Sequence, residues 1–401
     1  MEAEINFQKS LRTSKVFLHF EDGTSFQGYV NRQKDDSELS RGIWGEAAFT
    51  TGMSGYEETI TDPSFLGQHI IFTNAHTGNY ESDERVRQSS QPYATCLISR
   101  NFSPNKFLNQ IKIPLVSALD TRALTKFIVN SKVSQKSVLT TRENAPSKEE
   151  FSKASLICSE LQRVSQEHPE VVIEGKNPVV LINYGMKNAI LENFKAMGFP
   201  LVTLPYNVSA KEVLSYKPRM IFLSNGPGDP RDYKKEVLEV RELFNSNIPV
   251  RGICLGHQLI TLALGAEIIK LPFGQRGANH PCLDTVTGNI VITSQNHGYA
   301  SDETSLERIL LDNILNREIF ISFKSLFDKS VEGISTTDHF LKSVQFHPEA
   351  NPGPKDAAYF FEEIKDFLNG KFSPKVDSKK IHPLIDVTKR SSKISPIKKF
   401  F

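Results

Sequence analysis

Cys254 stands in a stretch that suits a cysteine nucleophile. The run PVRGICLGHQ over residues 249–258 predicts a short buried strand that turns sharply into a helix. Gly252 and Gly256 flank the cysteine where a tight strand-to-helix turn leaves no room for a Cβ atom. The helix expected over residues 255–264 directs its positive N-terminal end at the sulfur and favours the thiolate. The alternative is an inert buried cysteine, against which the paired glycines argue.

A cysteine nucleophile needs a nearby base and a group that orients this base. The residues FHPE end a strand expected over residues 342–346, which places His347 and Glu349 at its carboxyl end. Side chains two residues apart in an extended chain point the same way, so the imidazole can face the sulfur while the carboxylate holds its other nitrogen. An isolated surface strand end is the alternative. Three other histidines fit less well. His257 points away from the cysteine and is expected to pack, whereas His280 and His297 are expected in loops and lack a carboxylate two residues later. The run QNHGY over residues 295–299, which contains His297, is expected to form a substrate loop.

Attack on a carbonyl group also needs hydrogen-bond donors for the oxyanion. The backbone N–H of Leu255, directly after the nucleophile, is one candidate. A second is Gly226 in the run SNGPGDP over residues 224–230, where glycine permits an unusual peptide orientation. This run could instead bind phosphate, but it lacks the Lys-Ser/Thr pair of a P-loop and does not lead directly into a helix.

Strands alternate with helices after residue 178, which predicts βαβ units and a mainly parallel sheet covered by helices on both faces. The expected strands are 179–183, 200–205, 220–224 and 250–253, with helices over 186–198 and 234–245. Chemistry in such sheets collects beyond the carboxyl ends of the strands. Cys254 and the Gly226 loop both follow such ends, so the sequence predicts that they are neighbours.

The first part of the chain lacks this alternation and is predicted to form an α+β, β-rich domain over residues 16–142. It opens with a hairpin of strands 16–20 and 25–30, and it includes a helix over 121–130 capped by Asp120. The other expected units are a leader over residues 1–15, a polar linker over 143–177 with one short helix, an α/β domain over 178–370, and a basic mobile tail over 371–401.

Composition narrows the class of protein. The 401 residues carry a net charge of +2, and nine Lys or Arg against two Asp in residues 371–401 place the basic excess in the tail, so no nucleic-acid partner is expected. No apolar run approaches the ~20 residues that span a membrane. The four cysteines form no C-x-x-C pair, which argues against a zinc site and against a disulfide framework. We expect a soluble protein in a reducing compartment, with no bound metal.

Together the elbow, the SNGPGDP loop and the FHPE segment resemble the class I, or triad, glutamine amidotransferases. The N-terminal half narrows the resemblance. Gly45 and Glu46, the run FTTGMSGYEETITDP over residues 49–63, TGN over 77–79 and ALDTRAL over 118–124 are similar to the small subunit of glutamine-dependent carbamoyl phosphate synthetase. This resemblance runs from about residue 15 to residue 370.

The resemblance implies that glutamine acylates Cys254 and releases ammonia, with His347 as base and then acid and Glu349 as its orienting group. It implies that one set of residues holds the glutamine: Gly52, Gly226, Gly228, Leu255, Gln258, Asn296, Gly298 and Tyr299. A large ATP-grasp subunit would receive the ammonia and make carbamoyl phosphate from bicarbonate for pyrimidine and arginine synthesis. This chain would carry no cofactor, since ATP and Mg²⁺ are implied only for the large subunit.

The chain departs from the family pattern at Asn183, where Asp is usual, and at Gln275 and Arg276, which replace a histidine pair. Some members of the family have Ser at the position of Gly52. This chain has no side chain there, so it could contact substrate only through its backbone. Two other hypotheses remain open: an amidotransferase that serves another acceptor, such as anthranilate or a purine, and a non-catalytic docking protein of the same fold. Heavy use of Lys, Asn, Ile and Phe suggests an AT-rich genome, and hence a plastid stroma as an alternative to the cytoplasm.

Overall fold

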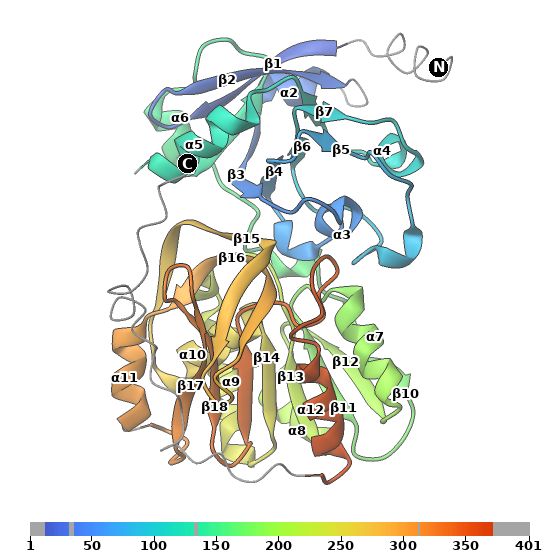
Figure 1. Cartoon of the computed structure of the whole chain (residues 1–401), viewed down its shortest axis with the longest axis vertical. Helices are drawn as coiled ribbons and strands as arrows, with labels where there is room; N and C mark the ends of the chain where they lie inside the picture. The colour runs from blue at the N-terminus through green and yellow to red at the C-terminus, as the bar shows by residue number, and fades with distance from the viewer. Residues whose placement is uncertain (1–12, 32–35, 132–134, 312, 372–401) are drawn as a thin grey trace, which may run out of the picture.

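The computed structural model describes residues 13–31, 36–131, 135–311 and 313–371, which form two domains stacked along the long axis (Figure 1). The N-terminal domain carries a barrel, and the C-terminal domain is built on one large sheet. The predicted basic tail over residues 371–401 lies outside the described residues except for Lys371. Most of the predicted leader over residues 1–15 does too, but its last three residues already belong to the first strand.

A closed barrel of seven strands forms the core of the N-terminal domain. Alternate residues of its first strand, Val16, Leu18 and Phe20, pack in one apolar cluster inside the barrel. Phe17 and His19 between them are buried as well, because other parts of the chain cover the outer face of this strand. The predicted hairpin is confirmed, since the first two strands pair antiparallel. In barrel order the strands are β1 (Thr13–Phe20), β2 (Ser25–Asn31), β8 (Leu115–Ser117), β6 (Cys96–Ile98), β4 (Gln68–Phe72), β3 (Ile43–Thr50) and β9 (Lys136–Thr140).

Helix α5 (Thr121–Asn130) has the predicted bounds and the predicted cap, because the Asp120 side chain accepts a hydrogen bond from the Ala123 N–H at 2.9 Å. Leu124 and Ile128, one turn apart, are buried against the barrel. The remaining elements of this domain are short: α2 (Asp36–Arg41), α3 (Tyr56–Ile60), α4 (Lys106–Gln110), β5 (His76–Thr77) and β7 (Asn101–Phe102).

The segment predicted as a linker, 143–177, contains more structure than expected. Its short helix is present as α6 (Lys148–Lys153), with a capping box between Ser147 and Glu150. Its last part forms β10 (Glu170–Ile173), an edge strand that pairs antiparallel with the large sheet. The sequence hid this strand because an edge strand needs little apolar surface, and Glu170 and Val171 are in fact exposed.

The C-terminal sheet has ten strands, and its centre is parallel as predicted. Residues of one strand alternate between the two faces: Val179 and Leu181 pack in one apolar cluster, and Val180 and Ile182 in the other. The five parallel strands, in sheet order, are β12 (Leu201–Pro205), β11 (Val179–Asn183), β13 (Met220–Leu223), β14 (Val250–Ile253) and β19 (Leu341–Val344).

The other half of the sheet is antiparallel and was not predicted. Its main feature is a long hairpin that rises toward the barrel (Figure 1), made of β15 (Ile268–Asp284) and β16 (Ile290–Ser301). The two further strands are β17 (Ile319–Ser325) and β18 (Val331–Thr336). Residues 295–299, expected to form a substrate loop, lie within β16, and His280 and His297 are likewise on strands instead of loops.

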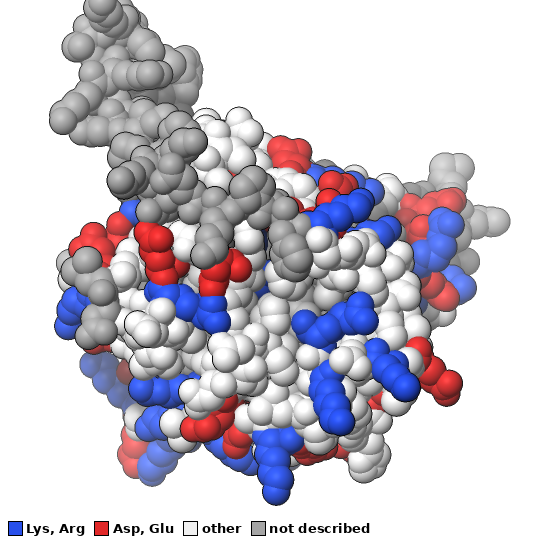
Figure 2. Space-filling view, turned by 90° about the horizontal axis from the view of Figure 1, so that it is seen from below, with Lys and Arg blue, Asp and Glu red and all other residues white. Residues whose placement is uncertain are grey.

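Helices cover both faces of the sheet. One apolar cluster joins the sheet to α8 (Ala210–Ser215), α9 (Lys234–Leu243), α10 (Leu255–Leu264) and α11 (Glu303–Leu311), and the other joins it to α7 (Asn188–Met197) and α12 (Tyr359–Leu368). No helix of the described residues is long and apolar enough to cross a membrane. On the outer face of this domain, Lys and Arg are interspersed with Asp and Glu (Figure 2).

The hairpin joins the two domains. The Arg276 carbonyl on β15 accepts a hydrogen bond from the Thr51 N–H at 3.1 Å, and the Gln135 side chain donates to the Pro272 carbonyl at 2.8 Å. The barrel therefore faces the end of the parallel sheet at which the residues of the predicted site lie.

Candidate active site

Cys254 lies at a strained turn between β14 and α10. Its backbone has φ 53° and ψ −105°, a conformation that an L residue adopts only where the surrounding structure enforces it. A Cβ atom on Gly256 would lie 2.2 Å from the Leu223 carbonyl oxygen, and one on Gly252 would lie 2.9 Å from the backbone of Gly256. The two glycines thus permit the turn for the reason predicted from the sequence, and α10 has the predicted bounds.

His347 and Glu349 follow β19, the parallel neighbour of β14. The imidazole Nδ1 and the carboxylate Oε1 of Glu349 are 2.6 Å apart, and both side chains are buried. The backbone N–H of His347 donates to the Ser294 carbonyl on β16 at 2.9 Å, which fixes the segment beside the hairpin. The Nε2 atom is buried and has no hydrogen-bond partner among the described residues. That nitrogen is therefore available to a reacting group.

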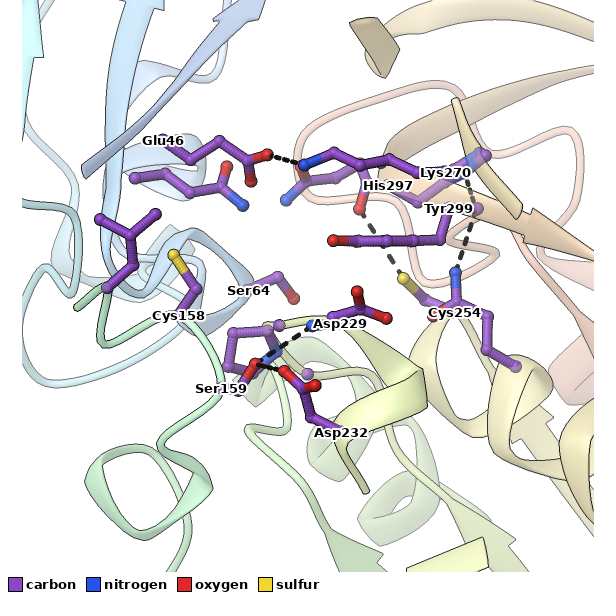
Figure 3. Close-up of a pocket in the computed structure, with 18 of the residues that line it drawn as sticks. Glu46, Ser64, Cys158, Ser159, Asp229, Asp232, Cys254, Lys270, His297 and Tyr299 are labelled. Carbon is purple, nitrogen blue, oxygen red and sulfur yellow. Dashed lines mark hydrogen bonds and ion pairs between the residues drawn. The ribbon is translucent and has the colours of Figure 1, made fainter. Parts of the chain in front are cut away.

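The Cys254 sulfur and the Glu349 carboxylate both act electrostatically on the His347 imidazole. Burial lowers the pKa of His347, but the negative charges of Glu349 and Cys254 outweigh burial and raise this pKa to about 10. The hydrogen bond of the Cys254 thiol goes to the Asn296 carbonyl oxygen, 3.7 Å from Sγ (Figure 3). The His347 ring and the sulfur are thus coupled electrostatically, as a cysteine nucleophile and its base must be.

Lys187 completes this group and was missed by the sequence reasoning. Its Nζ lies 2.9 Å from Oε1 of Glu349 and donates to the Ala350 carbonyl at 2.6 Å, and the side chain is fully buried. Burial raises the pKa of Glu349, but Lys187 and then His347 outweigh it and lower this pKa to about 2. The only signal in the sequence was a lysine just beyond the carboxyl end of the β11 strand, where functional side chains of such sheets collect.

A cavity of about 260 Å³ opens beside Cys254 and lies between the two domains (Figure 3). This is room for a small polar ligand. Cys254 and six of the eight predicted substrate residues line it: Gly226, Gly228, Gln258, Asn296, Gly298 and Tyr299.

The two other predicted substrate residues lie elsewhere. Leu255 is buried behind the cavity at the first position of α10, where a helix leaves its backbone N–H without an intrahelical acceptor. Gly52 lines two smaller cavities, one of which it shares with His347 and Asn296. The structure therefore does not bring Gly52 to the wall of the main cavity. The loop beyond β3 that carries this glycine runs on the far side of Arg276 and Asn296, which border both spaces.

The side chains of two predicted substrate residues already have protein partners. The amide nitrogen of Gln258 donates to the Tyr299 carbonyl at 3.1 Å and to the Gln345 side chain at 3.0 Å. The amide nitrogen of Asn296 donates to Asp62 of the barrel domain at 2.9 Å, so this contact also couples the two domains. These bonds hold the cavity wall in place.

Charged residues that the sequence reasoning did not assign also line the cavity. Glu46 of the barrel domain pairs with Lys270 of β15 at 2.5 Å (Figure 3). Asp229 pairs with Arg231, which lies just outside the cavity lining, at 2.6 Å. Glu46 and Lys270 come from segments far apart in the sequence, so no local spacing could have shown that they meet. His257, by contrast, packs as predicted, with ring nitrogens 2.9 Å from the Ser343 hydroxyl and 3.2 Å from the Ser301 hydroxyl.

The side chain of Asn183, the last residue of β11, forms hydrogen bonds through both its oxygen and its nitrogen. Its side-chain oxygen accepts hydrogen bonds from the N–H groups of Gly185 and Met186, at 2.9 and 2.8 Å, and its amide nitrogen donates to Gln166 at 3.1 Å. A carboxylate could make the first two bonds but not the third, so the departure from Asp is matched by a donor bond.

Comparison with known proteins agrees with this geometry. Residues 180–367 match the family model described as glutamine amidotransferase class-I, and residues 18–138 match that described as carbamoyl-phosphate synthase small chain, CPSase domain. The carbamoyl phosphate synthase small chain of Listeria monocytogenes is 37% identical over 89% of this chain and 98% of its own length. That of Caldanaerobacter subterraneus is 38% identical over 88% and 96%, and that of Staphylococcus epidermidis 38% over 88% and 97%. The chain therefore belongs to the carbamoyl phosphate synthase small-chain family and carries a class I glutamine amidotransferase domain.

Proposed function

We propose that this chain hydrolyses L-glutamine to glutamate and ammonia through a thioester on Cys254, and that it supplies the ammonia to a large ATP-dependent subunit that makes carbamoyl phosphate from bicarbonate. One observation carries the proposal. The His347 ring is held by Glu349 and is coupled electrostatically to Cys254, which stands on a strained elbow at the wall of a cavity, and its Nε2 atom has no geometric hydrogen-bond partner among the described residues. Family membership supports the reaction class.

The acylation step uses groups on both sides of the amide. The Cys254 thiolate attacks the side-chain carbonyl carbon of glutamine, and the N–H groups of Leu255 and Gly226 donate to the oxyanion that forms. Gly226 must be glycine for this, because a Cβ atom there would lie 2.3 Å from the Tyr184 carbonyl oxygen. The His347 imidazolium then gives its Nε2 proton to the departing nitrogen, so ammonia leaves and the thioester remains.

Deacylation reverses the role of the imidazole. Neutral His347 takes a proton from water at Nε2, the hydroxide adds to the thioester carbonyl, and the carbon–sulfur bond breaks to release glutamate. Glu349 stabilises the imidazolium that forms in this step, and Lys187 keeps Glu349 ionised. None of these steps uses a cofactor on this chain. We assign ATP and Mg²⁺ to the large subunit.

The partner and the pathways follow from the family. A small chain implies a large subunit, and the carbamoyl phosphate would serve pyrimidine and arginine synthesis. The chemistry requires Cys254 to remain a thiol, and the four cysteines are free, in keeping with a reducing compartment. The plastid location suggested by residue usage has no support from the relatives named above, which are bacterial.

The test uses the full chain mixed with the large subunit of a bacterial relative, ATP, bicarbonate and either glutamine or ammonium chloride. We expect carbamoyl phosphate from both nitrogen sources with the native chain. With Cys254→Ser we expect it from ammonium only, because the large subunit keeps its own chemistry. Glutamine-driven synthesis that survives the substitution would overturn the proposal, and so would a native chain that releases no ammonia from glutamine.

A further inference from the structure

A buried guanidinium on the cavity wall has unused hydrogen-bonding capacity. Arg276 of β15 is 5% exposed, and its Nη1 donates to the Phe273 carbonyl at 3.0 Å. Its Nε is buried without a partner in the described part of the chain, and no carboxylate of that part forms an ion pair with it. A buried cation with an idle donor costs several kcal/mol unless something compensates it. Among the described residues, no carboxylate contacts the guanidinium directly to compensate this cost.

Two of the three acidic residues that line the cavity have cations of their own, and the third, Asp232, accepts a hydrogen bond from the Ser159 hydroxyl at 2.7 Å. Glu46 pairs with Lys270, and Asp229 pairs with Arg231. Burial lowers the pKa of Arg276, and the charge of Glu46 opposes this effect from a distance. Arg276 is therefore a cation of the cavity wall that has no carboxylate partner among the described residues.

The backbone is shaped around this side chain. A Cβ atom on Gly274, whose φ is +71°, would lie 2.6 Å from Nη1 of Arg276, and one on Gly298 would lie 3.5 Å from its Nη2. The guanidinium thus occupies a slot between two glycines. Thr51 of the barrel domain donates to the Arg276 carbonyl from both its N–H and its hydroxyl, each at 3.1 Å, which anchors the slot across the domain boundary.

We propose that Arg276 binds the α-carboxylate of L-glutamine, an inference that rests on the proposed function. Cys254 and Arg276 line the same cavity. Glutamine carries its reacting amide and its carboxylate at opposite ends, so one molecule can reach both groups. A guanidinium fork matches a carboxylate with two parallel hydrogen bonds. This gives a role to a position at which the chain departs from its family's histidine pair.

The experiment measures how protein variants at Arg276 bind two ligands that differ only in the carboxylate. Full-length Cys254→Ser chain is titrated calorimetrically with L-glutamine and with its α-carboxamide, in which a neutral amide replaces the carboxylate. Hydrogen bonds to a charged group predict that glutamine binds roughly 10- to 100-fold more tightly than the carboxamide. Adding Arg276→Gln should bring the two affinities within about threefold of each other. Arg276→Lys keeps the charge but not the forked pair of donors, so its ratio of the two affinities should lie between those of the native residue and of Arg276→Gln.

Steady-state kinetics of the complex with the large subunit give the second readout. In the background with intact Cys254, Arg276→Gln should raise KM for glutamine roughly 10- to 100-fold and change kcat little. Arg251→Gln is the matched control. Arg251 is also buried, but its three hydrogen bonds go to backbone carbonyls remote from the cavity, so the ratio of the two affinities should stay native.

The outcomes separate the two proposals. Discrimination between glutamine and the carboxamide that persists in Arg276→Gln, or an equal loss in Arg251→Gln, would overturn the carboxylate role. If Arg276→Gln does not fold, native discrimination in Arg276→Ala or Arg276→His would overturn it, and lost discrimination there would support it. A native chain that neither binds nor hydrolyses glutamine would instead overturn the proposed function itself.

Discussion

Two glutamates of the C-terminal domain, Glu349 and Glu332, are both wholly buried and both lie near a histidine, yet they differ in charge. Oxygen Oε1 of Glu349 is 2.6 Å from His347, and Oε1 of Glu332 is 3.7 Å from Nε2 of His297. The pKa of Glu349 falls to about 2, whereas burial raises the pKa of Glu332 to about 8. At neutral pH one is an anion and the other is a neutral acid.

The partners explain the difference. Glu349 has a buried ammonium, Lys187, at 2.9 Å, while the side-chain donors to Glu332 in the described part of the chain are neutral, the Gln295 amide at 2.8 Å and the Ser330 hydroxyl at 3.0 Å. Burial lowers the pKa of His297 to about 3, so this histidine supplies no charge. One cation at contact distance therefore decides whether a buried carboxylate is ionised, and hence whether it can stabilise an imidazolium or only hold a strand in place.

Among the substitutions that test this comparison, removal of His347, the proposed base, should have the largest effect on activity. His347→Asn deletes the proton carrier of both steps, so glutamine hydrolysis should fall by roughly 10³-fold or more. Ammonia release from glutamine measures the loss, and ammonium-driven carbamoyl phosphate synthesis in the same preparation is the control. His297→Asn, at the histidine beside Glu332, should lose much less of its kcat. Equal losses in kcat would refute the distinct roles of the two pairs.

Lys187→Met removes the ammonium beside Glu349 and should raise the pKa of this carboxyl group, as burial raises that of Glu332. Because the folded pKa of Glu349 is depressed, its contribution to stability is present above about pH 4.5 and is lost as the pH falls toward 2. Without the ammonium this contribution should vanish, at a cost of roughly 3 kcal/mol in the free energy of unfolding. The acid limb of kcat against pH should move to higher pH.

Denaturant titrations and a pH–rate profile check this prediction. Lys187→Arg keeps the charge and should restore most of the native acid limb. An acid limb of Lys187→Met that coincides with the native one would show that Lys187 does not maintain the charge of Glu349.

Glu332→Gln should have a small effect on activity and a distinctive effect on stability. Because the folded pKa is raised, the native protein binds this proton more tightly than the unfolded chain, and the stability it provides is lost as pH rises from about 4.5 through about 8. The native protein should thus lose roughly 1 kcal/mol per pH unit relative to the variant across that window. Activity at neutral pH should change less than about threefold, since an amide replaces an acid that is already neutral.

Unfolding free energies of the two proteins at several pH values test this. Parallel pH dependence of native protein and Glu332→Gln between pH 5 and 8 would mean that Glu332 is ionised in the folded state, and the comparison with Glu349 would fail.

The sequence predicted what depends on near neighbours in the chain. Gly252 and Gly256 mark the elbow because steric limits act within a few residues, and His347 and Glu349 are two residues apart on one strand end. The bounds of α5, α10, β11 and β14 followed from caps and apolar period.

What the sequence did not show depends on contacts between distant segments. Lys187 meets Glu349 across 162 residues, and Glu46 pairs with Lys270 of the other domain. The β15–β16 hairpin was missed because its pairing is interrupted by register shifts, and β15 carries Gly274, Gly277 and Pro281, residues typical of loops. Six predicted substrate residues share one cavity, whereas Gly52 does not join them.

The central claim, a sulfur made nucleophilic by the His347–Glu349 pair, is tested most directly by trapping the thioester. Native chain mixed with glutamine and quenched in acid within milliseconds should contain a species heavier by the mass of glutamine less ammonia, and peptide mapping should place the added group on Cys254. The adduct should be absent from Cys254→Ser. Ammonia release without any adduct on Cys254, or an adduct on another residue, would contradict the account.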